Sequence, residues 1–357
     1  MRSTYRSGQA ASSAWRGRGA LVRLRGVGSY VANWKEVLAT SNLSEGKPVD
    51  FVSRWLILTR ASVFPMTLTS GLIGGLLAAG HPRANWRYFA ASLLGLVAAH
   101  ACNNLMNDYF DLTGGVDQSD SPRALYAPHP VLAGWISRRG LVEAIAAFNA
   151  VGAAVLIYLF WARGWPVVAF AAAGLFVSVF YVAPPLRLKH HGLGEAGVFV
   201  VWGPLMVGGT YYVTTGEIPT WVWAASLPYA ILVTTVLIGK HVDKLEHDSR
   251  KGIRTLPVLL GAEASLALNR ALMASFYLVV VALVLSGTLG VWVLLVLGSL
   301  PLYAKVWGVY SKPRPAAPPP RYPIWPLWYV AAAFVLTRRA GALFVLGLLL
   351  NRLAPML

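Results

Sequence analysis

The chain has 357 residues, of which 56% are hydrophobic and only 13% are charged. Soluble domains carry about 25% charged residues, and a soluble fold of this length has too small an interior to hide so much apolar side chain. A soluble globular enzyme is therefore excluded. The single cysteine, Cys102, also excludes an intrachain disulfide and a thiol metal cluster.

Cations outnumber anions, since 31 Lys and Arg face 14 Asp and Glu and the formal net charge is +17. Such an excess suits nucleic acid, anionic lipid or a substrate that carries phosphate. For so apolar a chain we expect membrane lipid and a phosphorylated substrate as partners, and no nucleic acid.

The N-terminal residues 1–54 precede the first apolar run. We expect them to form a basic tail outside the bilayer, and residues 55–355 to form the membrane domain. The first 35 residues are rich in Arg and Ser and contain no acid. That composition is typical of an organellar transit peptide. The preferred interpretation is a partly disordered tail that lies on anionic lipid headgroups.

Apolar runs of about 20 residues are long enough to cross a bilayer as helices. Eight such runs follow the tail, at residues 56–80, 86–106, 141–161, 165–183, 194–213, 221–238, 266–287 and 289–310. The last apolar stretch, 324–353, is interrupted by Arg338 and Arg339. We expect it to form an interfacial piece up to Leu336 and then a ninth span, with one unbroken helix as the alternative. The predicted fold class is an all-α polytopic membrane protein.

The cations predict an orientation. The tail up to Arg60 carries ten of the 31 Lys and Arg, and further cations gather in the loops after the second, fourth, sixth and eighth spans. The alternate loops contain only Arg83, Arg87 and Arg163. Because short loops rich in Lys and Arg remain in the cytoplasm, we expect the tail and these loops to be cytoplasmic. A bacterial plasma membrane is the expected location, and an organellar membrane is the alternative.

The acids form two groups near the membrane boundary, where an ionised carboxylate is costly and usually functional. Asp108, Asp111 and Asp117 lie at the end of the second span and just beyond it. At about 100° per residue, Asn104, Asp108 and Asp111 share one helix face within about 60°. Gly114 and the following glycine then break the helix, which lets the chain bring Asp117 back toward the same place.

The second group, Asp243, Glu246 and Asp248, follows the sixth span. Asp243 and Asp248 are five residues apart, about 140° around an ideal helix. Either a π-type bulge realigns them, or Glu246 replaces the missing partner.

Carboxylates held close together repel one another unless a cation lies between them, and hard oxygen ligands select Mg²⁺. Because Mg²⁺ also prefers phosphate oxygens, the pattern predicts a phosphorylated substrate. Nearby cations suit a diphosphate, namely Arg123, Lys189, Lys251 and Arg254. The competing interpretation is that these acids and bases only solvate or cap helix ends.

At these two groups the sequence resembles the UbiA family of intramembrane aromatic prenyltransferases. The resemblance covers residues 55–355 and rests on Asn107-Asp108-Tyr109-Phe110-Asp111, Gly115-Val116-Asp117, Gly192-Leu193-Gly194-Glu195 and the run from Gly252 to Gly261. It is strongest to the branch that prenylates 1,4-dihydroxy-2-naphthoate in menaquinone synthesis. It implies nine transmembrane helices around a central cavity.

The resemblance also implies roles for the residues. Asp108, Asp111 and Asp117 would ligate Mg²⁺, with Asn104 oriented into the same site, and Asp248 would serve a second Mg²⁺. Asp108, Asp111 and Asp248 would be the catalytic residues. Tyr181 and Lys189 would close over the diphosphate and the acceptor. No organic cofactor is expected.

The acceptor stays open, because Lys240 and His241 stand where the naphthoate branch often has Asn. 4-Hydroxybenzoate, another phenol and glycerol phosphate are the alternatives within the same fold. A transporter of an anionic lipid is a less favoured alternative, since its acids would lie near the middle of the bilayer. A CDP-alcohol phosphotransferase is disfavoured because its Asp-Gly-x-x-Ala-Arg spacing is absent.

Overall fold

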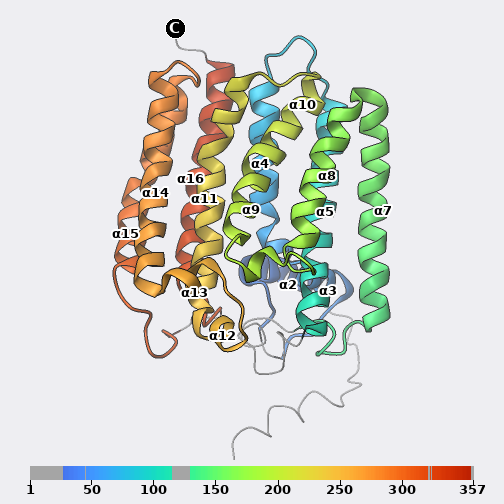
Figure 1. The fold of residues 1–357 in the computed structure, drawn as a ribbon, viewed down its shortest axis with the longest axis vertical. Helices are drawn as coiled ribbons and strands as arrows, with labels where there is room; N and C mark the ends of the chain where they lie inside the picture. Colours follow the sequence, from blue (N-terminus) through green and yellow to red (C-terminus); the bar gives the residue numbers. More distant parts are fainter. Residues whose placement is uncertain (1–26, 45, 115–128, 321, 323, 355–357) are drawn as a thin grey trace, which may run out of the picture.

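The computed structural model describes residues 27–44, 46–114, 129–320, 322 and 324–354, and this part of the chain is built from helices without a β-strand. Most of the helices run side by side along the long axis of the molecule (Figure 1). The helical elements of the bundle are α4 (Phe64–Ala78), α5 (Trp86–Thr113), α7 (Arg138–Arg163), α8 (Trp165–Phe180), α9 (Gly194–Val200), η3 (Val201–Gly208), α10 (Gly209–Thr215), α11 (Thr220–Asp243), α14 (Ala262–Leu285), η4 (Val291–Ser299), α15 (Leu300–Tyr310) and α16 (Tyr329–Leu353).

The number of spans differs slightly from the prediction of nine. Within the described ranges, eight helical segments are long and apolar enough to cross a membrane. The remaining apolar helix, α8, has 16 residues. At 1.5 Å per residue it is about 24 Å long, shorter than a hydrocarbon core of about 30 Å. The protein is therefore an integral membrane protein whose described part contains eight helical segments of full length and one shorter apolar helix.

Two ends of the predicted spans are corrected. The first run does not begin as one helix at Leu56, because Arg60 adopts a left-handed backbone with φ 54° between α3 (Phe51–Leu58) and η1 (Ala61–Val63). The last stretch is not divided at Arg338 and Arg339. Both residues are exposed on an unbroken α16, so their charges do not interrupt its packed face.

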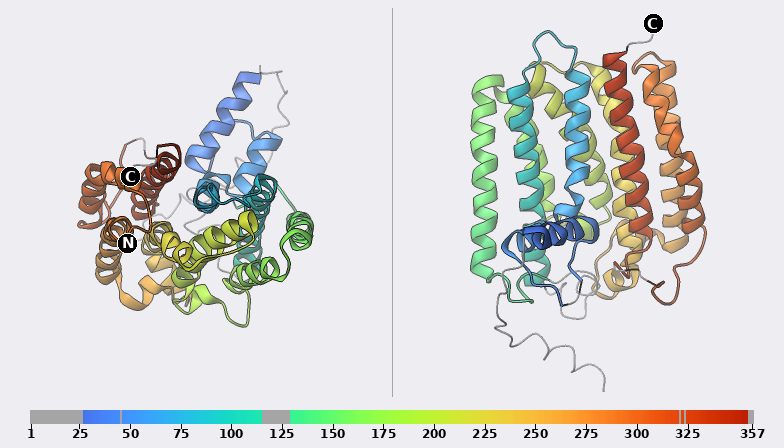
Figure 2. Two further views of the ribbon diagram at one scale, coloured as in Figure 1. Left: turned by 90° about the horizontal axis from the view of Figure 1, so that it is seen from above. Right: turned by 180° about the vertical axis from the view of Figure 1, so that it is seen from behind.

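The helices α2 (Val27–Thr40) and α3 run crosswise to the bundle axis near one end and extend beyond its side (Figure 2). The indole of Trp34 in α2 donates to Asp50 at 2.9 Å, and Asp50 also caps α3 by accepting from the Ser53 amide at 2.9 Å. The predicted domain boundary at 54/55 falls inside α3, and the tail residues 1–26 lie outside the described part.

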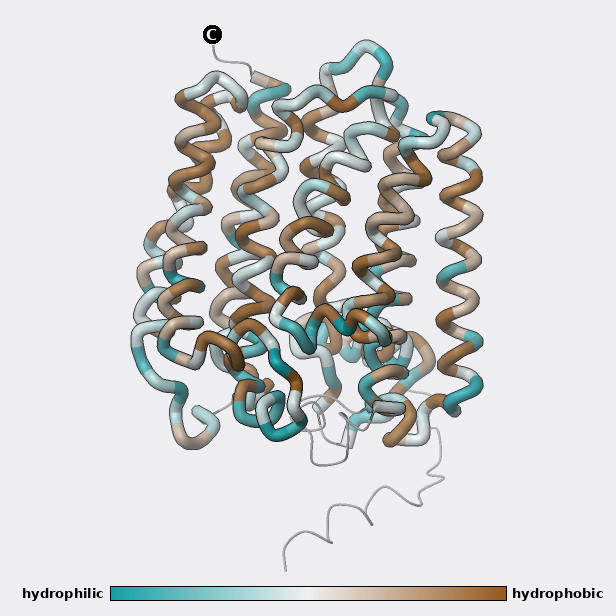
Figure 3. Tube along the Cα trace, in the orientation of Figure 1, coloured by the Kyte–Doolittle hydropathy of each residue, from teal (hydrophilic) through white to brown (hydrophobic). Residues whose placement is uncertain are grey.

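The hydropathy of the residues changes along the long axis of the bundle. Apolar residues line the middle of the bundle, and polar residues gather at both ends (Figure 3). The short helices α12 (Leu245–Arg250) and α13 (Leu256–Leu260) share one end with α2 and α3 (Figure 1). The most buried span is α11, which packs against α14, α16 and η3. The second acidic group begins at the last residue of α11, Asp243, and lies at the polar end of the molecule.

Candidate active site at the polar end of an apolar cavity

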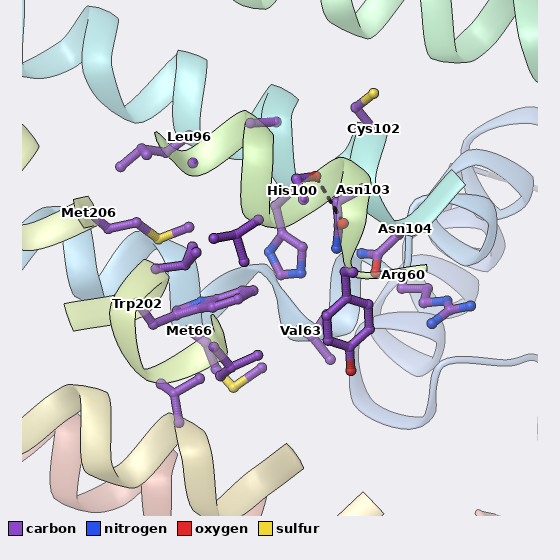
Figure 4. A pocket seen from close by; sticks show the side chains of 18 of the residues that line it. Arg60, Val63, Met66, Leu96, His100, Cys102, Asn103, Asn104, Trp202 and Met206 are labelled. Carbon is purple, nitrogen blue, oxygen red and sulfur yellow. Dashed lines mark hydrogen bonds between the residues drawn. The ribbon is translucent and has the colours of Figure 1, made fainter. Parts of the chain in front are cut away.

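A cavity of about 710 Å³ lies among the helices. Most of its wall is apolar and comes from α4, α5, α7, α8, η3, α11 and α16. Figure 4 shows Met66, Leu96, Trp202 and Met206 along this wall. The charged lining residues, Arg60 and Lys240, lie toward one end of these helices, together with Asn103, Asn104, Asn107 and Tyr181. His100, Asn149 and several hydroxyl side chains also line the cavity. The cavity can therefore take a long apolar molecule with a charged head.

The first acidic group lies on α5 beside the polar end of the cavity. Asp108 has no exposed surface and forms an ion pair with Arg60, which lines the cavity. Asp111 is also buried, and the ammonium of Lys189 lies 3.1 and 3.2 Å from its two carboxylate oxygens. The cations offset the repulsion that two close buried carboxylates would otherwise suffer. Asp117 and Arg123 lie outside the described residues.

Two tight turns position Arg60 and Lys189 at these carboxylates. Arg60 itself has a left-handed backbone, and Lys189 lies in η2 (Leu188–His190), which follows the left-handed Arg187 with φ 40°. Positive φ is uncommon for residues other than glycine and often marks a functional site. The Lys189 amide donates to the Tyr181 carbonyl at 3.0 Å and closes the loop. Burial, followed by the charge of Lys189, lowers the pKa of His190, so this imidazole is neutral at neutral pH.

Two asparagines on the same face of α5 differ in how they are used. The predicted site residue Asn104 donates its side-chain amide to the Thr59 carbonyl at 2.9 Å. Asn107 also lines the cavity, and its buried side-chain oxygen has no hydrogen-bond partner. Asn107 is not among the site residues predicted from the sequence, although it lies four residues before Asp111 and so on the same helix face. An open amide oxygen beside two carboxylates is a hard ligand for a cation.

The three acids of the second group lie in different environments. The Asp243 carboxylate accepts three backbone amides at the start of α16, from Trp328 at 2.9 Å and from Tyr329 and Val330 at 3.0 Å. These bonds satisfy the N-terminus of α16, whose amides have no partner within the helix.

Glu246 and Asp248 lie in opposite environments. The Glu246 side chain is 82% exposed and lies 3.7 Å from Arg250, on the outside of α12. Asp248 has no exposed surface, and neither of its oxygens has a hydrogen-bond partner. The Lys244 ammonium lies 3.9 Å from it. Only Asp248 of this group is thus buried with open carboxylate oxygens.

Asp111 and Asp248 lie near one another beside the polar end of the cavity, although neither is among its lining residues. Tyr181, which lines the cavity, interacts electrostatically with both Asp111 and Asp248. Lys244, next to the second group, likewise interacts with Asp111. A β-bridge between His191 and Arg254 joins the loop that carries Lys189 to the loop that follows Asp248.

The cations after the second acidic group lie at the surface. Lys251 and Arg254 are exposed and, like Lys189 and the acids, are not among the residues that line the described cavity, so their role in binding diphosphate stays a prediction. Lys240 does line the cavity, although it is not among the predicted substrate-binding residues. A lysine three residues before the end of an apolar helix is the signal that could have identified it.

The fit of Mg²⁺ can be judged from the donors. In the described parts of the chain, no three His, Cys, Asp or Glu side chains are arranged to hold a metal by themselves. The first group nevertheless offers hard oxygens from Asp108, Asp111 and the unpartnered amide of Asn107. Because Mg²⁺ completes its shell with water and substrate phosphate, these residues fit a magnesium ion that binds together with a phosphorylated substrate.

Solved structures with the same fold are known. The chain is similar to a UbiA homologue from Aeropyrum pernix K1, with a TM-score of 0.60 and 18% identity over 81% of this chain and 98% of that one. It is also similar to a UbiA homologue from Archaeoglobus fulgidus bound to GPP and Mg²⁺, with a TM-score of 0.54 and 19% identity over 82% and 99% of the two chains.

Characterised relatives share more of the sequence. The 1,4-dihydroxy-2-naphthoate octaprenyltransferase of Bacillus subtilis is 26% identical over 249 residues, which are 68% of this chain and 78% of the relative. The 2-carboxy-1,4-naphthoquinone phytyltransferase of Synechocystis is 28% identical over 242 residues, or 67% and 75% of the two chains. The model of the UbiA prenyltransferase family matches residues 67–330. The chain therefore belongs to the UbiA prenyltransferase family and is a membrane-embedded prenyltransferase.

Proposed function

We propose that the protein transfers a polyprenyl group from prenyl diphosphate to 1,4-dihydroxy-2-naphthoate in a reaction that requires Mg²⁺. The observation that carries this proposal is the pairing of a buried charged site with an apolar cavity. The charged site consists of Asp108 with Arg60, Asp111 with Lys189, and Lys240. The acceptor is inferred from the relatives in Bacillus subtilis and Synechocystis, whose names include a naphthoate or a naphthoquinone.

The donor would lie along the cavity with its diphosphate at the polar end. The apolar wall binds the prenyl chain and excludes water, which would otherwise capture a reactive carbocation. Asn107, Asp108 and Asp111 would hold Mg²⁺, an ion that is bound together with GPP in the similar UbiA homologue from Archaeoglobus fulgidus. When bound, the ion neutralises charge on the diphosphate and makes it a better leaving group.

The chain's own residues would support each bond change. The carbon–oxygen bond of the donor breaks, and the diphosphate leaves with the electron pair. The cations Arg60, Lys189 and Lys240 stabilise the charge that develops on it. The indole face of Trp202, which lines the cavity, stabilises the allylic cation by cation–π attraction. The ring carbon that bears the carboxylate then attacks the cation to form the new carbon–carbon bond. The bond to the carboxylate breaks, CO₂ leaves, and the electron pair of that bond restores the aromatic ring.

The location of the site follows from the orientation of the loops. The cation-rich end of the bundle would face the cytoplasm, where a water-soluble aromatic acid and Mg²⁺ are available. We propose a bacterial plasma membrane, with an organellar membrane as the alternative. The prenyl chain would enter from the bilayer, because the cavity is enclosed by membrane-spanning helices.

The test supplies the purified protein in detergent with prenyl diphosphates of several lengths and a panel of acceptors, and identifies the products by mass spectrometry. We expect a prenylated naphthoquinol, with loss of CO₂, that forms with Mg²⁺ and not with EDTA. The panel includes 4-hydroxybenzoate and glycerol phosphate. A product from one of these alone would reject the naphthoate acceptor, and no transfer to any acceptor would reject the proposed reaction.

A further inference from the structure

Lys240 near the end of α11, Lys244 at its C-terminal cap and Asp248 in α12 are spaced by four residues. Lys240 lines the cavity, whereas Lys244 and Asp248 are not among its lining residues. Lys244 and Asp248 are 8% and 0% exposed, and the ammonium lies 3.9 Å from the carboxylate. Lys240 and Lys244 both interact electrostatically with Asp111 of the first group. The two lysines therefore lie near the first acidic group, at the polar end of the cavity.

The second acidic group does not fit a divalent ion. Asp243 uses both carboxylate oxygens to accept backbone amides of α16, and Glu246 is on the outer surface of α12. One carboxylate, Asp248, remains, and the residue four positions before it is Lys244, where a second carboxylate would be needed to complete a pair on one helix face. The first group differs, because it combines two buried carboxylates with the open amide oxygen of Asn107.

We propose that the ammonium groups of Lys240 and Lys244 take the place of the second Mg²⁺ that the sequence resemblance implies. The diphosphate is then held by one divalent ion on the side of α5 and by two lysines on the side of α11. Together the lysines supply the same charge as one Mg²⁺. Asp248 is a positioning residue, since its carboxylate holds Lys244 in the buried site. This inference rests on the proposed function, because it assigns the groups that bind the donor's diphosphate.

The number of bound ions tests it directly. Purified protein in detergent is titrated with Mn²⁺ in the presence of a non-cleavable thio analogue of geranyl diphosphate, and bound Mn²⁺ is counted by electron paramagnetic resonance. We expect one Mn²⁺ per chain and no dipolar coupling between ions. Two coupled Mn²⁺ ions would overturn the inference and leave the proposed function intact. If the analogue does not bind at all, the proposed function fails as well.

Variants separate the role of the lysines from general damage. Lys244→Gln should weaken binding of the analogue by about 10- to 100-fold, because it removes a charged hydrogen-bond donor, while the Mn²⁺ count stays at one. Arg250→Gln is the matched control, because it removes an exposed cation from the neighbouring α12, and we expect unchanged affinity. Equal affinities of Lys244→Gln and the wild type would overturn the inference.

A gain of metal binding gives a second, independent readout. Lys244→Asp places two carboxylates four residues apart and should raise the count to two Mn²⁺ per chain in protein that is folded by circular dichroism. If this variant is folded and still binds one ion, the inference that Lys244 excludes the second ion is wrong. If it does not fold, Lys240→Gln replaces it as the test. We expect that variant to lose analogue affinity without a change in the Mn²⁺ count, and unchanged affinity would overturn the inference.

Discussion

Asp108, Asp111 and Asp248 lie near the polar end of one cavity, but they obtain their cations in different ways. Asp108 pairs with Arg60, 48 positions away, and Asp111 pairs with Lys189, 78 positions away. Asp248 pairs with Lys244, four residues away. The first group is therefore assembled by the tertiary fold, whereas Asp248 has its cation on the same segment. The first site thus depends on how the helices pack, whereas the Lys244–Asp248 pair depends on local chain geometry.

The same comparison separates buried acids by what their oxygens do. Asp243 and Asp248 are both buried near the end of α11. Asp243 is satisfied by three backbone amides, whereas Asp248 has two open oxygens. Burial alone therefore does not identify a functional carboxylate. The hydrogen-bond partners of each oxygen have to be known.

The largest effect is expected at the first group. Asp111→Asn removes a buried charge that we assign to Mg²⁺, so the transfer rate should fall by about 100- to 1,000-fold. The measurement is product formation per folded protein at saturating Mg²⁺, with thermal unfolding recorded in the same detergent. Glu143→Gln is the matched control, because it removes an exposed acid that pairs with Arg139 on α7. Equal rates for Asp111→Asn and the control would reject the metal role of Asp111.

The cation that pairs with Asp111 should have the next largest effect. Lys189→Gln removes a buried ammonium that we expect to contact the diphosphate, so kcat/KM for the donor should fall by about 10- to 100-fold. The acceptor KM should change much less. Lys305→Gln removes an exposed lysine on α15 and should leave both constants unchanged. A change confined to the acceptor constant would move Lys189 to the acceptor site.

Asp243→Asn should lower stability and leave the transfer rate unchanged, whereas Asp111→Asn and Lys189→Gln should lower the rate. The amide has one accepting oxygen in place of two, so the N-terminus of α16 loses charged acceptors and the free energy of unfolding should fall by about 1–3 kcal/mol. The folded fraction should keep its transfer rate, because the Asp243 carboxylate is bonded to backbone amides of α16 and is not an open ligand for a metal ion. Thermal unfolding and rate are measured on one sample. A lost rate at unchanged stability would make Asp243 a metal ligand after all.

Much of the fold could be predicted from the sequence, because a run of apolar residues has few stable arrangements in a bilayer. The exceptions are local. Arg338 and Arg339 suggested a break, but charge alone does not say which way a side chain points, and both are on the exposed face of α16. The break at Arg60 depends on one left-handed residue, which hydropathy cannot detect.

The site was predicted less completely. The spacing of Asp108 and Asp111 on one helix face placed both of them in the same buried region, as expected. Arg60 was counted only among the basic residues of the tail, because its contact with Asp108 exists only after the chain folds. The sequence left open whether Asp243 aligns with Asp248 through a π-type bulge or Glu246 replaces it. Asp243 meets the start of α16 some 85 residues later in the chain, and Glu246 is exposed. The partners of Arg60 and Asp243 depend on contacts between segments that are distant in the sequence, and the spacing of residues along the chain does not reveal such contacts.

The smallest effect is expected at Glu246, and it tests the division of the second group. Its side chain is 82% exposed and its partner Arg250 is 81% exposed, so the pair is solvated and contributes little to stability. Glu246→Gln should change the free energy of unfolding by less than about 0.5 kcal/mol, and the Mg²⁺ concentration for half-maximal transfer should stay the same. If that concentration rose, Glu246 would reach the metal in the working enzyme. The second group would then be a carboxylate site like the first, and the contrast between them would no longer hold.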